Sequence, residues 1–536
     1  MILQVEGDTL HIQCTFAEGQ RIKREIPFDG RASGWSPRSK TWTLPATPGY
    51  YERLKELFDN VETNDSAAQP LAARAANRRY AHDETLPIHN YKTQPWEHQV
   101  APIAFTATSD IGLLHMHMGT GKTKVVFDTI AICKLKRILV LCPKAVIPTW
   151  KSEEEKHGDI KVHTLNTGST AKRAKMIGPD GLYALNYEAA WQGDLAKAIL
   201  AIDWDMVVFD ESHRIKSHTG KASKFCARIK AAKRFALTGT PMPHSPLDIF
   251  GQYRALDPGI FGDSWTKFQT HYAQLGGYAV NGRAVQVIGY RNEEELKRRM
   301  DKIRIEVRKD ALTLPPLQII DFPVTLAGAA RWHYDTMENL FIAEIESGVV
   351  TASNALSKLL RLQQITSGFL PLEGHVEAIG EHKAEALETL LEDMGDEPCV
   401  VFCRFRHDLD VIRDTAKKTK RKYSELSGRH NDLETWRSGV IGVQIQAGAE
   451  GVDLTRARYA IYYSLGYSLG QYEQSIARLH RPGQEHPVTI YRLLCQKSVD
   501  EKVAKALEKR KCAIQDIMNM YGGDHGYERS EGMDAA

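Results

Sequence analysis

The chain has 536 residues, of which 42% are hydrophobic and 26% are charged, and its formal net charge is +3. This length predicts about three or four domains. No apolar run approaches the roughly 18 residues of a membrane span, and the opening MILQVEGDTLHIQC lacks the basic and apolar regions of a signal peptide. We therefore expect an intracellular protein with no membrane partner, cytoplasmic in a bacterium or a virus-infected cell and nuclear in a eukaryote. Any basic surface for nucleic acid must be local.

The cysteines argue against a zinc site. All eight are scattered, and only Cys399 and Cys403 lie near each other. Both fall in one apparent strand with no second pair of ligands nearby, so buried reduced thiols are favoured.

Residues 1–60 are predicted to form a small α+β domain. Alternating stretches such as LHIQCTF and the segment GWSPRSKTWTLP precede YYERLKELF, which has a helical pattern. Residues 61–90 lack a sustained apolar period and are rich in Ala, Asn and Asp, which is typical of a linker.

From residue 91 onward the pattern changes to short apolar runs that alternate with amphipathic helical segments. This alternation predicts α/β lobes, each a parallel sheet wrapped by helices. We expect a first lobe over 91–262, a helical insertion and link over 263–375, a second lobe over 376–521 and a disordered tail over 522–536.

A phosphate-binding loop is predicted where GTGKTKVVFDTI follows the strand-like run LLHMHM. Glycines let backbone N–H groups close on phosphate oxygens, and the helix N-terminus adds positive potential. Lys122 is then placed to reach the β- and γ-phosphates, and Thr123 to bind magnesium. The strict pattern has a glycine where this chain has Met116, so the match is to a shortened form, with a chance Gly-rich turn as the alternative.

The stretch MVVFDESHRIK ends a hydrophobic strand in Asp210 and Glu211. Beside a phosphate loop, carboxylates at the carboxyl end of a strand suit two tasks. Asp210 can hold the magnesium shell, and Glu211 can polarise the attacking water. A solvated acidic turn is the alternative, and the phosphate loop counts against it.

Together these segments resemble a known family. MGTGKT, DESHRIK, LTGTP and QSIARLHRPGQ are similar, in order, to motifs I, II, III and VI of superfamily-two helicases, most closely the Swi/Snf branch of double-stranded DNA translocases. QPWEHQ, VLCPKAVIPTW, LNYEAAW and IEVRKDALTLPPLQ resemble further segments of the family, so the resemblance covers about residues 91–511. The chain departs from the family at Ser212 in motif II, at Ala449 in motif V, and before motif VI, where LGYSLGQYEQ replaces Trp-Asn-Pro.

The resemblance implies two RecA-like lobes, ATP and Mg²⁺ as cofactors, and DNA-dependent ATPase activity. It implies metal ligation by Thr123 and Asp210 and an adenine-reading role for Gln99. The nucleotide contacts that it implies are Gln99, Gly119, Thr120, Gly121, Lys122, Thr123 and Asp453. Coupling of hydrolysis to motion is implied at His213, Thr238 and Thr240.

Two arginines in SIARLHRPGQ, Arg478 and Arg481, are three residues apart. In a helix this spacing places both on one face, where they repel each other unless an anion lies between them. The resemblance implies that the anion is the γ-phosphate of ATP, reached when the lobes close, and that Gln474 positions one arginine or the nucleotide. Such an arginine contributes about 10³ to 10⁵ in rate. A surface helix with exposed arginines is the alternative.

Nucleic-acid contacts are also implied by the resemblance, at Pro143, Lys144, Asn186, Tyr187 and Arg404. Contacts to the phosphate backbone give binding that depends on salt and tolerates sequence. For Lys144 and Arg404, ordinary surface charge is an equal alternative.

The N-terminal segment resembles the HARP-type accessory domain of annealing helicases, through Trp35 and Trp42 around short strands before a helix. In that family the domain directs the motor to forked or branched DNA. A small cap domain with core tryptophans is the alternative.

The sequence therefore predicts an ATP-dependent double-stranded DNA translocase that remodels forked or branched DNA by annealing, branch migration or fork regression. One alternative is a helicase that separates strands of DNA or RNA. Another is an ATP-switched clamp that displaces or recruits DNA-bound proteins. A nuclease is disfavoured, because no metal-binding carboxylate cluster occurs outside the ATPase motifs.

Overall fold

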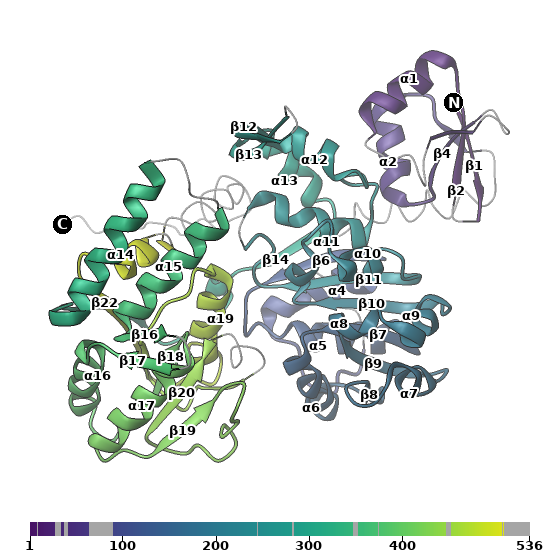
Figure 1. The fold of residues 1–536 in the computed structure, drawn as a ribbon. Coiled ribbons are helices and arrows are strands. Elements are labelled where there is room, and N and C mark those ends of the chain that lie inside the picture. The colour runs from purple at the N-terminus through teal and green to yellow at the C-terminus, as the bar shows by residue number, and fades with distance from the viewer. Residues whose placement is uncertain are drawn as a thin grey trace, which may run out of the picture. The chain divides into compact units, whose positions relative to one another are not determined.

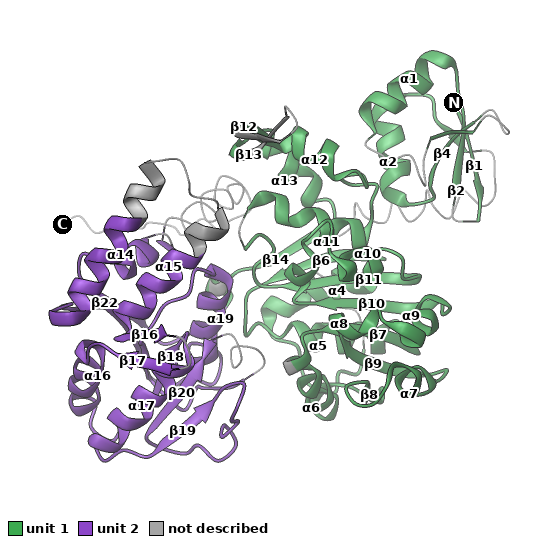
Figure 2. Cartoon of the chain, viewed as in Figure 1, with its two compact units in different colours: residues 1–311, 515–536 green, residues 312–514 purple. Residues whose placement is uncertain are grey.

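The computed structural model describes the chain except residues 8, 27–33, 37–40, 64–88, 244, 281–282, 313, 347–351, 373–374, 446–451, 506 and 509–536. The chain divides into two compact units, one formed by residues 1–311 and the other lying within residues 312–514 (Figure 2). Most of the predicted linker and the whole predicted tail lie outside the described residues.

The first unit begins with a small α+β domain. Its five-stranded sheet has the order β3-β4-β2-β1-β5, and helices α1 and α2 complete it (Figure 1). Leu10 and Ile12, from the alternating stretch of the sequence, are buried in its core. The elements are β1 (Ile2–Glu6), β2 (Thr9–Gln13), α1 (Phe16–Glu25), β3 (Gly34–Ser36), β4 (Thr41–Pro45), α2 (Pro48–Leu57) and β5 (Glu62–Thr63).

The rest of the first unit is an α/β lobe around a seven-stranded sheet of order β14-β6-β11-β10-β7-β9-β8, in which all pairs are parallel. Its strands are β6 (Ile111–Met116), β7 (Arg137–Cys142), β8 (Val162–Thr164), β9 (Gly181–Asn186), β10 (Trp204–Asp210), β11 (Ala231–Thr238) and β14 (Arg304–Val307).

Both faces of this sheet are covered. Leu139 and Leu141 pack into one hydrophobic cluster while Ile138 and Val140 pack into another, because successive side chains of a strand point to opposite faces. The covering helices are η2 (Glu97–Gln99), α4 (Val100–Thr108), α5 (Lys122–Ile132), η3 (Lys144–Val146), α6 (Ile147–His157), α7 (Thr170–Lys175), α8 (Tyr187–Ala190), α9 (Gly193–Leu200), η4 (Ser212–Ile215), α10 (Lys221–Cys226), η5 (Pro246–Asp248) and α11 (Ile249–Leu256).

The second unit contains the other α/β lobe. Its six-stranded sheet has the order β15-β22-β21-β18-β20-β19, with parallel pairs throughout. The strands are β15 (Leu317–Val324), β18 (Cys399–Cys403), β19 (Tyr423–Leu426), β20 (Val440–Gln444), β21 (Tyr459–Tyr462) and β22 (Val488–Cys495). The remaining elements are α14 (Gly328–Glu346), α15 (Ala352–Thr366), the hairpin β16 (Phe369–Leu372) and β17 (His375–Ala378), α16 (His382–Asp393), α17 (Arg406–Lys418) and α19 (Leu469–Leu479). The two lobes confirm the predicted fold class.

The segment between the lobes, predicted as a helical insertion over 263–375, contains more than helices. Strand β14 pairs with β6 at one edge of the first sheet, and β15 pairs with β22 at one edge of the second sheet. Between α11 and β14 the chain forms α12 (Trp265–Tyr272), the hairpin β12 (Ala273–Val280) and β13 (Arg283–Tyr290), and α13 (Glu293–Met300). The short helix η6 (Lys309–Ala311) lies between β14 and β15.

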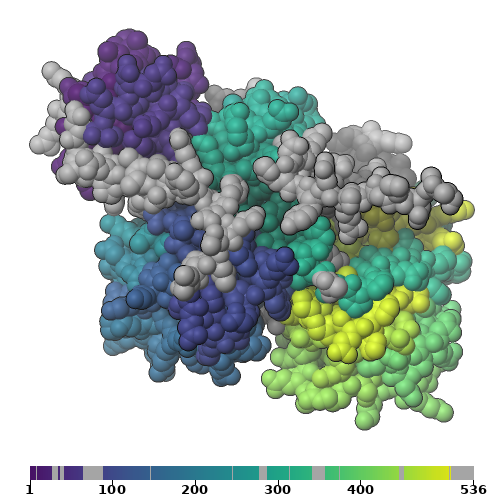
Figure 3. Space-filling view, turned by 180° about the vertical axis from the view of Figure 1, so that it is seen from behind, coloured from purple at the N-terminus to yellow at the C-terminus, as the bar shows by residue number. Residues whose placement is uncertain are grey.

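Asp257, just after α11, joins the small domain to the first lobe. Its carboxylate accepts hydrogen bonds from Thr47 Oγ1 at 2.6 Å and from Gly49 N at 2.8 Å, so it caps the N-terminus of α2. It also accepts from Gly259 N at 2.7 Å and is 2% exposed. A Cβ on Gly259 would lie 2.1 Å from Tyr50 N, so only glycine permits this approach. Lys267 Nζ, in α12, donates to Lys23 O of the small domain at 3.4 Å. Figure 3 shows the surface of the small domain in purple.

Among the described residues, no helix is long and apolar enough to cross a membrane. Within the same ranges no cluster of metal-ligating side chains occurs, and the seven described cysteines are free thiols.

Candidate active site

The predicted phosphate loop lies between β6 and α5. Gly119 and Gly121 have φ angles of 83° and 79°, in the left-handed region that favours glycine. A Cβ on Gly121 would lie 2.2 Å from Gln99 Nε2. Lys122 is the first residue of α5, and its Nζ donates to Met116 O at 3.1 Å, so the ammonium folds back over the loop. Thr120 is fully buried and ties the loop together, since its Oγ1 donates to His117 O at 2.6 Å.

Gln99 is built into the base of this loop. It is 1% exposed, its Nε2 donates to Thr120 O at 3.0 Å, and its Oε1 accepts from Trp96 N at 2.9 Å. His98 Nε2 lies 3.1 Å from the same Thr120 carbonyl. The segment QPWEHQ is therefore fastened to the phosphate loop through Thr120.

Asp210 is the last residue of strand β10, next to β11 in the same sheet, and Glu211 follows it. Asp210 Oδ2 accepts from the indole N–H of Trp150 at 3.0 Å, and Oδ1 accepts from Glu211 N at 3.0 Å. Burial, with a smaller contribution from the charge of Glu211, raises the pKa of Asp210 to about 6, while the charge of Lys122 acts in the opposite direction.

Glu211 has φ 49° and ψ 53°, a left-handed conformation that is unusual for a residue with a side chain. Its buried Oε2 has no hydrogen-bond donor among the described residues and lies 3.4 Å from His213 Nδ1.

The three predicted coupling residues form a chain of contacts that leads away from Glu211. His213 Nδ1 lies 3.4 Å from Thr238 Oγ1, and Thr238 Oγ1 accepts from Thr240 N at 3.0 Å. Thr238, at the end of β11, is fully buried. Motifs II and III are thus connected through side chains at the carboxyl ends of adjacent strands.

These residues fit ATP and magnesium. The two left-handed glycines and the start of α5 give backbone N–H groups and a helix N-terminus for phosphates. Asp210 offers carboxylate oxygens of the kind Mg²⁺ prefers, and Thr123 in the first turn of α5 offers a hydroxyl. The unpaired Oε2 of Glu211 is the acceptor expected of a group that awaits a water proton.

The predicted DNA contacts of the first lobe differ in exposure. Pro143 and Lys144 lie in the turn after β7, and Lys144 is exposed. Asn186 ends β9, and its Nδ2 donates to Glu188 Oε2 at 3.0 Å. Tyr187 is 2% exposed, and its hydroxyl donates to Asp210 O at 2.8 Å. The Tyr187 side chain therefore faces the main chain of Asp210 rather than solvent, because its aromatic ring at the start of α8 packs into the core.

In the second unit, Arg404 is partly occupied by protein groups. Its Nη1 donates to Gln363 Oε1, and its guanidinium carbon lies 5.3 Å from the ring centroid of Tyr467. Burial lowers the pKa of Arg404. Asp453 is exposed, and its Oδ1 accepts from Thr455 N and Oγ1 at 3.0 and 2.8 Å. Ala449 lies outside the described residues.

The predicted pairing of Arg478 and Arg481 on one helix face is corrected by the structure. Helix α19 ends at Leu479, so Arg478 is in its last turn and Arg481 lies beyond it. Arg481 precedes Pro482, and a residue before proline is disfavoured in the helical region. The Nε atom of Arg481 is buried with no hydrogen-bond partner among the described residues, while Gln474 is 3% exposed within α19.

Trp35 and Trp42 pair across β3 and β4, with ring centroids 6.0 Å apart. Trp35 is 50% exposed, whereas Trp42 packs against the core of the small domain. Of these two tryptophans, Trp35 therefore offers the more exposed aromatic surface.

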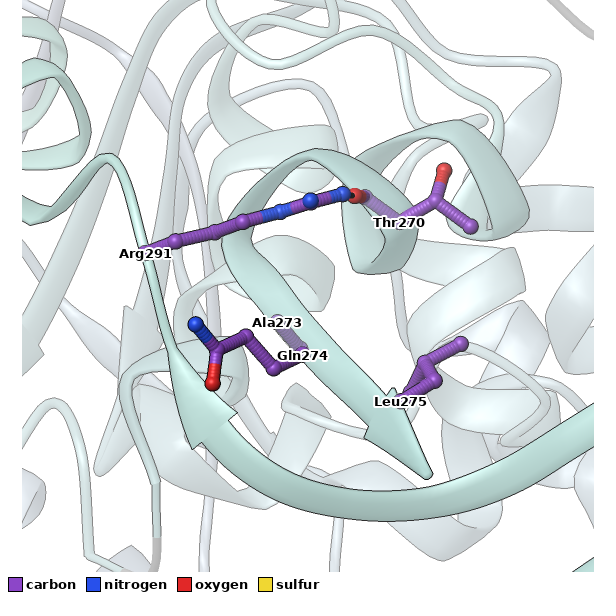
Figure 4. Close-up of a pocket in the computed structure, with 5 residues that line it drawn as sticks. All are labelled: Thr270, Ala273, Gln274, Leu275 and Arg291. Carbon is purple, nitrogen blue, oxygen red and sulfur yellow. Dashed lines mark hydrogen bonds between the residues drawn. The ribbon is translucent and has the colours of Figure 1, made fainter.

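Sequence reasoning missed Trp150, the donor to Asp210, because a buried tryptophan on α6 has no signal that distinguishes it from core. A cavity of about 310 Å³ at the base of the β12–β13 hairpin is lined by Thr270, Ala273, Gln274, Leu275 and Arg291 (Figure 4). None of these five belongs to the phosphate loop or to motif II, so this cavity is separate from the site described above.

Two family models match this chain. The family described as "SNF2-related domain" matches residues 61–367, and "Helicase conserved C-terminal domain" matches residues 382–483. The chain is 26% identical over 444 residues to "Putative protein p41" of Acyrthosiphon pisum secondary endosymbiont phage 1, covering 75% of this chain and 92% of that protein.

A second relative is covered over less of its length. The chain is 26% identical over 438 residues to an uncharacterized ATP-dependent helicase of Mycoplasma genitalium, covering 76% of this chain but only 40% of that protein. Among solved structures, the Sulfolobus solfataricus SWI2/SNF2 ATPase core in complex with dsDNA aligns with a TM-score of 0.40 and 22% identity, covering 81% of this chain and 95% of that one.

Proposed function

We propose that this chain, which belongs to the SNF2-related family and is a DNA-dependent ATPase of the helicase type, is a double-stranded DNA translocase that remodels forked or branched DNA. The observation that carries the proposal is that the motor lobe holds a small domain with an exposed tryptophan, fastened by Asp257. A forked or branched DNA exposes unstacked bases on which an exposed aromatic side chain can stack, whereas plain duplex does not.

In the proposed hydrolysis, the chain's own residues orient the nucleotide. Gly119, Thr120, Gly121 and Lys122 hold the phosphates, while Thr123 and Asp210 hold Mg²⁺, which when bound neutralises developing charge on the phosphate oxygens. Glu211 accepts the proton of the attacking water.

The second lobe supplies the rest of the proposed mechanism. Arg481, with Arg478, stabilises the charge of the transition state, and Gln474 supports them. The contacts from Glu211 through His213 to Thr238 and Thr240 pass the state of the nucleotide to the end of β11. Each cycle then shifts DNA held at Lys144 and Asn186, and at Arg404 once the contact with Gln363 is released.

The test is ATPase activity on single-stranded, duplex, forked and four-way DNA and on duplex RNA. We expect the rate to rise with duplex length and to be highest on forked or four-way DNA. Lys122→Ala, the inactive control, is expected to lose nearly all turnover because the phosphates lose their ammonium. A rate independent of duplex length would favour an ATP-switched clamp, and displacement of a strand from forked DNA would favour a strand-separating helicase.

Substitution of Trp35 is the most direct test of the role proposed for the small domain. Trp35→Ala is expected to lower the preference for forked over plain duplex DNA several-fold, since stacking on one aromatic ring contributes about 1–3 kcal/mol per base. Phe16→Ala is the matched control, because Phe16 is an 84% exposed aromatic on another element of the same domain. Equal fork preference in both variants and the wild type would reduce the small domain to a cap.

A further inference from the structure

Two aromatic side chains from separate helices, α6 and α8, converge on Asp210. The Trp150 indole N–H donates to the carboxylate at 3.0 Å, and the Tyr187 hydroxyl donates to the main-chain carbonyl at 2.8 Å. Trp150 is fully buried and Tyr187 is 2% exposed, so both hydrogen bonds are shielded from water. Shielded hydrogen bonds between buried groups fix geometry more firmly than exposed ones.

Each donor is directly joined to a loop assigned to DNA. Trp150 lies in the first turn of α6, which follows Pro143 and Lys144 through the short helix η3. Tyr187 is the residue after Asn186 and begins α8. A displacement of either loop by a bound phosphate backbone must therefore move one of the two donors.

Asp210, which accepts both hydrogen bonds, is the residue at which a small rotation would most change the orientation of the carboxylates. Asp210 Oδ1 is held by Glu211 N at 3.0 Å, leaving Trp150 as the side-chain anchor for Oδ2. The Asp210 carbonyl belongs to the peptide that leads into the left-handed Glu211, whose conformation persists only if its neighbours enforce it. The hydrogen bond from the Tyr187 hydroxyl holds the carbonyl of that peptide in place.

We propose that Trp150 and Tyr187 are positioning residues that tie the two DNA-facing loops to Asp210, so that bound DNA sets the orientation of the carboxylates of motif II. This inference rests on the proposed function, in that it takes DNA to bind at these loops and nucleotide at Asp210. Trp150 acts on the carboxylate, and Tyr187 acts on the peptide that aims Glu211.

The test measures binding rather than turnover. Affinity for a non-hydrolysable ATP analogue with Mg²⁺ is measured with and without saturating blunt duplex DNA, on the full chain. Coupling between two sites typically changes affinity 5–150-fold, and the DNA affinity must change by the same factor when nucleotide is added, which provides an internal check. We expect Tyr187→Phe and Trp150→Phe to reduce that factor to less than about 2-fold while each ligand alone binds as in the wild type.

The lobe offers matched controls. Trp204 is 1% exposed and its indole N–H donates to Ile199 O at 3.0 Å, and Tyr183 is 1% exposed and its hydroxyl donates to Asp180 O at 2.9 Å. Trp204→Phe and Tyr183→Phe lose the same kind of buried hydrogen bond away from Asp210. They are expected to lower the thermal unfolding temperature but to keep the coupling factor.

The possible results separate the inference from its premise. Wild-type coupling in Tyr187→Phe, or equal loss in the control variants, would overturn the inference while leaving the proposed function intact. Absence of coupling in the wild type would instead overturn the premise. Should Trp150→Phe fail to fold, Tyr187→Phe decides the question alone, because it removes one oxygen atom and keeps the ring.

Discussion

Glu211 combines a strained main chain with an unsatisfied side chain. A left-handed conformation costs about 1–2 kcal/mol for a residue with a Cβ, and the buried Oε2 lacks a hydrogen-bond donor among the described residues. Neither feature stabilises the fold. Both are expected at a group whose partner arrives with the substrate.

Glu211→Gln should leave nucleotide binding intact and stop turnover, because an amide cannot take the water's proton. We expect a loss of about 10²–10⁴-fold in rate. The measurement is single-turnover hydrolysis alongside nucleotide affinity, with the exposed Glu188→Gln as control. A parallel loss of nucleotide affinity would make Glu211 structural.

Arg481→Ala should fold and bind nucleotide normally, since the phosphate loop belongs to the other unit. Hydrolysis should fall by about 10³-fold or more, and DNA should no longer stimulate it. Arg481→Lys should restore little, because an ammonium lacks the planar pair of donors.

The matched control is Arg406→Ala, an exposed arginine of the same unit. Nucleotide affinity and DNA-stimulated turnover are measured on the same samples. Near-normal turnover in Arg481→Ala would assign the transition-state charge to Arg478 alone.

Helix α2 is held at its N-terminus by a residue from another domain. Thr47 caps the helix and also donates to Asp257, so the carboxylate meets the positive end of the helix dipole. Lys302 supplements this contact through Glu56 and, at 3.8 Å, Glu52. Because such partly exposed ion pairs contribute only about 0–1 kcal/mol, Asp257 dominates the attachment.

Asp257→Ala should loosen the small domain from the lobe, because two donors of that domain, Thr47 Oγ1 and Gly49 N, lose a buried charged acceptor. We expect about 3 kcal/mol of destabilisation of this attachment, seen as faster hydrogen exchange at Gly49. The exposed Asp194→Ala is the control. Unchanged exchange at Gly49 would show that other contacts hold α2.

Most of the first-lobe site could be predicted because its residues occupy strand ends. Lys122, Asp210 and Thr238 follow apolar runs whose period is visible in the sequence, and parallel strands bring their carboxyl ends together. Burial of Tyr187 could not be predicted, because the motif marks its position but not the direction of its ring. Pro482 is a local sequence signal that a helix ends before Arg481, as α19 does. The three-residue spacing of the two arginines suggested a continuous helix instead.

Strand pairing between residues far apart in the chain could not be predicted from the sequence. Residues 304–307 and 317–324 lie in a region rich in helical patterns, and a short strand gains its stability from a partner far along the chain rather than from its own residues. The hairpin β12–β13 was also missed, although its two strands are neighbours in the chain.

Deletion of residues 1–60 should leave a DNA-stimulated ATPase, because every motor motif lies downstream. The truncated chain should prefer forks less and unfold at a lower temperature, since Asp257 and its surroundings become exposed. Substrate-dependent ATPase rates and thermal unfolding are measured together. Unchanged fork selectivity in the folded truncated chain would contradict the role given to the small domain.

The placing of β14 and β15 has a consequence for synthesis on the ribosome. Strand β6 pairs with β14 along one side, so this hydrophobic strand remains an open sheet edge until residue 307 has emerged. Strand β15 has no partner at all for a comparable time, because β22, its one neighbour among the described strands of the sheet, begins at Val488. Because synthesis adds roughly 5–20 residues per second, β15 stays unpaired for on the order of ten seconds. During this time its backbone N–H and C=O groups can pair with a strand of another chain. The nascent chain is thus most vulnerable to aggregation during translation of its second half, when ribosome pausing or chaperone capture would have the greatest effect on yield.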